Sequence, residues 1–222
     1  KTGEYKLALP LLLQTAPANS DWTAWLAGLG SKQRPPAEEE LTRIAALPKG
    51  GESAAWTREW LYYVARSQTA ADNLLAAEAA CTCLVQRLPK ADETCDAIWA
   101  LAGRFAKVEK KAQAIEWYKR LDETNAEHSR ADDALFAVME LQRGDKEIHT
   151  YVNACQHLAE RHPDSALLGK AWYGVGLAHE KAGEAKAAAD AFAEATKQIP
   201  GDFYVHRALA RLPNREGRLV PV

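Results

Sequence analysis

The sequence predicts an all-α fold, a right-handed superhelical solenoid of antiparallel helix pairs. Helices are expected because runs of alternating β-branched residues are almost absent, while Ala, Leu, Glu, Lys and Gln dominate and apolar residues recur at helical spacing. The arrangement follows from a second observation: shifting the chain by 37 residues aligns several columns of small and apolar residues at once. One helix pair cannot bury its own apolar face, so the repeats are expected to stack.

The N-terminal residues hold the least regular repeats. Residues 1–20 are predicted to be a partial repeat that supplies only a second helix. Residues 21–57 are predicted to be a degenerate repeat, because the second helix is short and begins only after Pro35 and Pro36.

Four complete repeats follow, each a first helix, a turn and a second helix. Their predicted bounds are 58–94, 95–131, 132–168 and 169–205. A small residue of the first helix faces a small residue of the second, which lets the two helices approach closely, and larger apolar residues fill the groove beside them. The aligned columns give the predicted core: Leu61, Ile98, Leu135 and Trp172; Ala65, Ala102, Met139 and Gly176; Ala77, Ala114, Tyr151 and Ala188; Cys81, Tyr118, Cys155 and Phe192; Leu84, Leu121, Leu158 and Ala195.

Helix breakers mark the ends of these repeats. Three of the four close on a proline, at Pro89, Pro163 and Pro200. The remaining repeat has Asn125 and Ala126 there instead. A closing helix is predicted at about 202–212, followed by a tail or linker at 213–222. Residues 1–212 are therefore expected to form a single helical-repeat domain.

The last complete repeat carries a known signature. Its residues at the signature spacings are Trp172, Val175, Gly176, Ala188, Phe192, Ala195 and Pro200. The chain therefore resembles the tetratricopeptide-repeat family, with looser copies in the other repeats and a step of 37 residues in place of the common 34. The resemblance implies a non-catalytic scaffold that binds a protein or peptide on the concave face of the superhelix.

A narrower resemblance concerns bacterial envelope proteins. The segments 130–136 (RADDALF), 161–184 and 201–212 (GDFYVHRALARL) are similar to the superhelical region of soluble lytic murein transglycosylases. As an alternative, this resemblance implies that the chain positions glycan strands of peptidoglycan for a catalytic domain beyond Val222. It also implies a periplasmic or otherwise extracytoplasmic location, with the cytoplasm as the other interpretation.

No catalytic residue is predicted within the chain, which is expected not to be an enzyme itself. Transglycosylases place their catalytic Glu directly before a Ser, and Glu52–Ser53 is such a pair. The surrounding signature is missing, however, and Ser53 is better interpreted as a helix N-cap.

The overall composition excludes some function classes. Among 222 residues, 28 Lys and Arg against 30 Asp and Glu give a net charge of −2, whereas nucleic-acid binding needs clustered basic residues. No apolar stretch approaches the roughly 20 residues of a membrane span. The start, KTGEYKLALPLLLQ, lacks Met and is interrupted by Pro10, so we expect a fragment or processed product rather than a signal peptide.

The four cysteines are expected to be structural. Cys81 and Cys155 fall in core columns, where a thiol acts as a small hydrophobic group. Cys83 and Cys95 lie near the end of one helix and the start of the next, so a helical hairpin could bring them within bridging distance. No cofactor or metal is predicted, because CxxC pairs are absent and the histidines are scattered.

One column of aromatic residues is the candidate binding site. It follows the first core position and contains Trp25, Tyr62, Trp99, Phe136 and Tyr173. By the tetratricopeptide resemblance this side of the first helix lines the concave surface, so the rings would form a ladder there. Charged residues of both signs flank it, and the cationic candidates for binding are Arg66, Arg143 and Lys170. Such a mixed surface suits a protein or peptide, and sugar rings could also stack on it.

Two interpretations of the ladder remain open, contact with a partner and packing between successive first helices. The adjacent rings Trp172 and Tyr173 illustrate the choice, since neighbours on a helix point about 100° apart. We expect Trp172 to close the interior of its helix pair and Tyr173 to be the last rung of the ladder.

Overall fold

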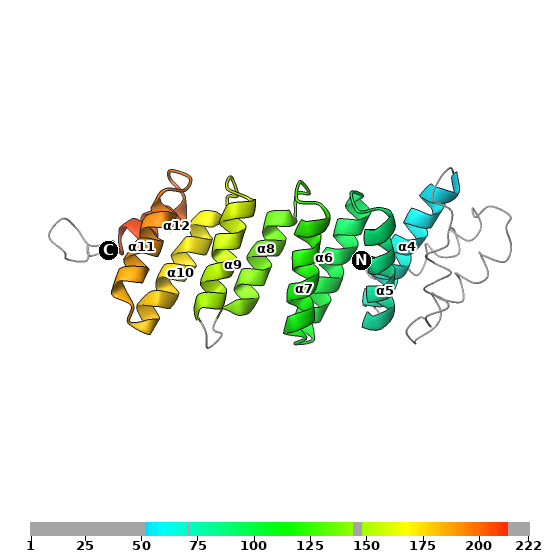
Figure 1. Ribbon diagram of the computed structural model, residues 1–222, viewed down its shortest axis with the longest axis horizontal. Helices are drawn as coiled ribbons and strands as arrows, with labels where there is room; N and C mark the ends of the chain where they lie inside the picture. The colour runs from blue at the N-terminus through cyan, green and yellow to red at the C-terminus, as the bar shows by residue number, and fades with distance from the viewer. Residues whose placement is uncertain (1–51, 71, 144–147, 213–222) are drawn as a thin grey trace. The chain divides into compact units, whose positions relative to one another are not determined.

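The computed structural model describes residues 52–70, 72–143 and 148–212, which contain nine α-helices and no strand (Figure 1). The prediction of an all-α fold is thus confirmed for the described part of the chain. The chain forms two compact units, an N-terminal unit, Lys1–His128, and a C-terminal unit, Ser129–Val222, where the sequence alone predicts one domain. The boundary lies inside the predicted repeat 95–131, shortly after Asn125 and Ala126, which stand in place of a closing proline.

Four helices are described in the N-terminal unit. They are α4 (Glu52–Ala70), α5 (Leu74–Arg87), α6 (Asp92–Lys107) and α7 (Lys111–Thr124). Helix α4 packs against α5 and α6, and α6 packs against α5 and α7. Because α4 begins at Glu52, Ser53 lies in its first turn and is not the N-cap residue predicted from the sequence.

Five helices make up the described part of the C-terminal unit. They are α8 (Ala131–Gln142), α9 (Ile148–Arg161), α10 (Leu168–Ala182), α11 (Ala185–Thr196) and α12 (Phe203–Leu209). Each helix from α8 to α12 packs against the next one along the chain, and α12 also contacts α10. The closing helix is therefore present and shorter than the predicted 202–212.

The turn between first and second helices has the same backbone conformation at three places. Asp72, Glu109 and Gly183 all have positive φ, at 61°, 61° and 78°. The residue after each donates its backbone N–H to a carbonyl five positions back, as in a Schellman motif: Asn73 to Gln68, Lys110 to Phe105 and Glu184 to His179. Gly183 adopts this conformation without steric cost, Asp72 is one of the residue types that tolerate it, and Glu109 is neither.

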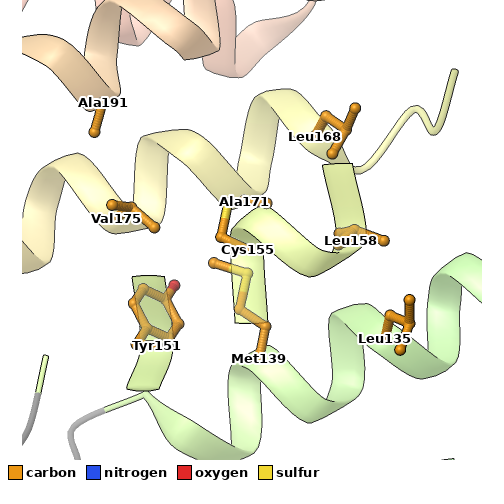
Figure 2. Packing of buried hydrophobic residues seen from close by; sticks show 9 residues of the cluster. All are labelled: Leu135, Met139, Tyr151, Cys155, Leu158, Leu168, Ala171, Val175 and Ala191. Carbon is orange, nitrogen blue, oxygen red and sulfur yellow. The ribbon is translucent and has the colours of Figure 1, made fainter. Parts of the chain in front are cut away.

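The core lies between the helices of each unit and matches the columns aligned in the sequence. Every predicted core residue is buried except Trp172, which is half-buried. In Figure 2 the α9 residues Tyr151 and Cys155 lie between Met139 of α8 and Val175 of α10. The core is thus built from side chains of consecutive helices.

Two glycines of α10 let large rings of neighbouring helices approach its backbone. A Cβ atom on Gly174 would lie 2.4 Å from the Tyr151 hydroxyl of α9. A Cβ atom on Gly176 would lie 2.4 Å from the Phe192 ring of α11. Real side-chain contacts are never this short, so these glycines are required by packing on two sides of one helix.

Candidate binding faces on the first helices

The predicted aromatic column lies on the first helices of both units, but its members differ in exposure. Tyr62, Trp99 and Phe136 are half-buried, whereas Tyr173 is buried. Trp25 lies outside the described residues. We call Tyr62, Arg66 and Trp99 the N-terminal aromatic face, and Phe136, Lys170, Tyr173, Phe203 and Arg207 the C-terminal aromatic face.

The N-terminal aromatic face is held by contacts between α4, α6 and α7. The Trp99 ring packs edge to face on Tyr118 of α7, with ring centroids 5.2 Å apart and an interplanar angle of 65°. Arg66 of α4 donates from Nη1 to the carbonyl of Asp96 on α6, at 3.5 Å. Packing therefore orients both candidates while leaving part of each side chain accessible.

The C-terminal aromatic face contains a cation over an aromatic ring. Nζ of Lys170 on α10 lies 4.7 Å from the centroid of the Phe136 ring on α8, within the range of a cation–π contact. Lys170 is exposed, so its ammonium remains accessible to a partner. Arg143 is not part of this contact, because it lies at the end of α8 and pairs with Glu140 at 3.3 Å.

Tyr173 occupies a different environment from the one its column predicts. Its ring lies 5.7 Å from Phe192 of α11 and 5.8 Å from Tyr204 of α12, and only 6% of the residue is exposed. Of the two interpretations of the ladder, packing between successive first helices is the one that fits Tyr173, because the closing helix covers its ring. Trp172 is the half-buried member of the pair and packs partly against core clusters on two sides.

The sequence reasoning missed Arg207. Its guanidinium carbon lies 5.6 Å from the Tyr173 centroid and 5.3 Å from that of Phe203. The 37-residue spacing could have identified it, because Arg207 lies 37 residues after Lys170. Both belong to a column of charged residues that stands three positions before the aromatic column. That column reads Glu59, Asp96, Asp133, Lys170 and Arg207. It changes from acidic to basic along the chain.

The cysteines are buried free thiols, and the suggested Cys83–Cys95 bridge is not formed. Burial raises the pKa of all four, to about 11 for Cys95 and about 12 for Cys155. A thiol with so high a pKa is a poor nucleophile at neutral pH. The described residues contain no group of three or more His, Cys, Asp or Glu side chains that could hold a metal ion.

Comparisons with known proteins leave the family open. No protein-family model matches the chain, and no curated protein matches it. Across the part of the chain that the structure describes, none of the helices has both the length and the apolar character needed to cross a membrane.

Proposed function

We propose that this chain is a tetratricopeptide-like scaffold that binds a peptide segment of another protein on the concave face of a right-handed superhelix. The observation that carries the proposal is the presence of half-exposed rings, Trp99 and Phe136, at equivalent positions of first helices. Each ring is oriented by one neighbouring side chain, Tyr118 for Trp99 and Lys170 for Phe136. Rigid, partly exposed aromatic side chains are the residues that most often anchor protein partners.

The helix positions support the repeat that this proposal needs. The second helices begin at Leu74, Lys111, Ile148 and Ala185, each 37 residues after the one before. The left-handed turn residues Asp72 and Glu109 share the same spacing. Equivalent turns and buried columns are what a stack of similar antiparallel pairs requires.

Binding is the mechanism proposed for these faces. Aromatic rings contribute contact area with little loss of side-chain entropy, because two torsion angles define them. Charged groups beside the rings, Arg66 and Lys170 among them, would fix the orientation of a bound segment.

The test is selection of binders from a display library of random peptides, followed by affinity measurement with the resynthesised peptides. Trp99→Ala and Phe136→Ala should each weaken binding at least about tenfold, as expected for loss of an aromatic anchor. Circular dichroism melting should show that both variants stay folded at the assay temperature.

Trp172→Ala is the matched control, because it removes another half-buried ring, one that packs against the core clusters. It should lower stability and leave the affinity of the folded protein unchanged. Failure to select any peptide would contradict the proposal, as would binding of a soluble peptidoglycan glycan fragment in place of peptides.

A further inference from the structure

We propose that the C-terminal aromatic face binds an acidic peptide segment, whose Asp and Glu carboxylates pair with Lys170 and Arg207. This inference rests on the proposed function and names the chemistry of the partner. It starts from two cations that occupy the same place in successive first helices, α10 and α12.

The two cations make the same kind of contact one repeat apart. Lys170 lies over the ring of Phe136, 34 residues before it, and Arg207 lies over the ring of Tyr173, also 34 residues before it. The aromatic column of one first helix is thus covered by the charged column of the next. Repetition of the contact makes it a feature of the surface rather than an isolated side-chain position.

Both cations are accessible and lack an acidic partner within the residues that the structure describes. Lys170 and Arg207 are exposed, and within the described part of the chain they interact with aromatic rings alone. Arg104 and Arg211 differ from them, since Arg104 pairs with Asp72 and Arg211 pairs with Glu180. The positive charge of Lys170 and Arg207 is therefore available to a ligand.

The ring contacts also lower the cost of binding an anion. A long cationic side chain in solution loses rotamer freedom when it pairs with a carboxylate. Here Phe203 and Tyr173 already hold the Arg207 guanidinium between 5.3 and 5.6 Å from their centroids. An oriented guanidinium can accept a carboxylate in the two-pronged geometry that arginine favours.

An apolar residue in the partner is expected beside its acidic ones. Phe203 is 60% exposed, which is high for a phenylalanine, and its ring adjoins both Arg207 and Tyr204. A segment in which Asp or Glu alternates with large apolar residues would pair with the cations and cover this ring. Charge and apolar exposure at one place thus favour an acidic amphipathic peptide.

The experiment uses the peptides selected from the random display library against the full chain. They should be enriched in Asp and Glu relative to the unselected library. By fluorescence anisotropy, Lys170→Glu and Arg207→Glu should each weaken their binding about tenfold, because each replacement removes an attraction and adds a repulsion. Lys186→Glu, an exposed lysine of α11, makes the same change in net charge and should leave the affinity unchanged.

The outcomes separate this inference from the proposed function. The acidic partner would be ruled out if the peptides that depend on Phe136 were neutral or basic. It would also be ruled out if they bound the Lys170→Glu and Arg207→Glu variants with unchanged affinity. In both cases the proposal of peptide binding would still hold. Loss of binding on amidation of the peptide C-terminus would also overturn the acidic partner, because a terminal carboxylate would then be the ligand. Circular dichroism melting of the Arg207 variant checks that α12 remains docked.

Discussion

Single residues in the turns carry backbone strain that their repeat position imposes. Glu109 has φ 61° in the turn after α6, where Gly183 occupies the equivalent turn after α10 with φ 78°. A left-handed conformation costs an ordinary residue about 1–2 kcal/mol. We therefore expect Glu109→Gly to raise the free energy of unfolding by about 0.5–1 kcal/mol, less than the full strain because glycine gains more freedom when unfolded.

The reverse change isolates the same effect. A Cβ atom on Gly183 would contact nothing within 4 Å, so Gly183→Ala should destabilise through the backbone alone, by about 1 kcal/mol. Glu116→Gly, at an exposed position in the middle of α7, should instead lose about 0.7–1 kcal/mol. Urea unfolding measures all three, and equal losses for both glutamate variants would contradict a strained turn.

At the scale of an element, the short helix α12 is the covering layer of the C-terminal unit. It has seven residues, too few to be stable alone, so it depends on the buried side chains Val205 and Ala208. Placing a carboxylate there would undock the helix and uncover Tyr173. We expect Ala208→Asp to lower the free energy of unfolding by about 2–4 kcal/mol.

Leu209→Asp provides the matched comparison on the same helix. Leu209 is 50% exposed, so its replacement by Asp should cost less than about 1 kcal/mol. Chemical denaturation of both variants measures the difference. Similar losses at the two positions would show that α12 does not depend on burial of Ala208.

For the whole molecule, the 37-residue periodicity predicts which residues of the repeats are buried, but it does not predict the contacts made at the C-terminal end of the described helices. The 37-residue columns identified the core because each small or apolar residue repeats in the same helical environment, as the buried Ala65, Ala102 and Met139 show. Tyr173 fits its column equally well, yet it is buried by α12, an element that the four complete repeats do not contain. Periodicity predicts a closing helix there, but it does not show that Tyr204 of this helix packs against the Tyr173 ring.

The buried thiols are divided unequally between the two units, so both units are expected to contribute to the loss of stability at alkaline pH. Cys81, Cys83 and Cys95 lie in the N-terminal unit and Cys155 in the C-terminal unit, all with a pKa raised by burial above the ordinary value of 9.0. Below pH 9 folded and unfolded chains both keep these protons. Above it the unfolded chain loses them first, so the free energy of unfolding falls with pH until the folded thiols ionise.

Between pH 8 and pH 10 the expected loss is about 1.4 kcal/mol for Cys95 and for Cys155, whose raised pKa keeps the folded thiol protonated over this range. Urea unfolding at pH 8 and pH 10 measures this loss. Because the cavity that a substitution leaves costs the same at both pH values, it cancels in the difference between the two free energies of unfolding. The triple variant Cys81→Ala, Cys83→Ala, Cys95→Ala should lose most of the pH dependence that the thiols cause, whereas Cys155→Ala should lose a smaller part of it. An unchanged pH dependence in the triple variant would mean that these thiols ionise equally in the folded and unfolded chain, and that the N-terminal core is open to solvent.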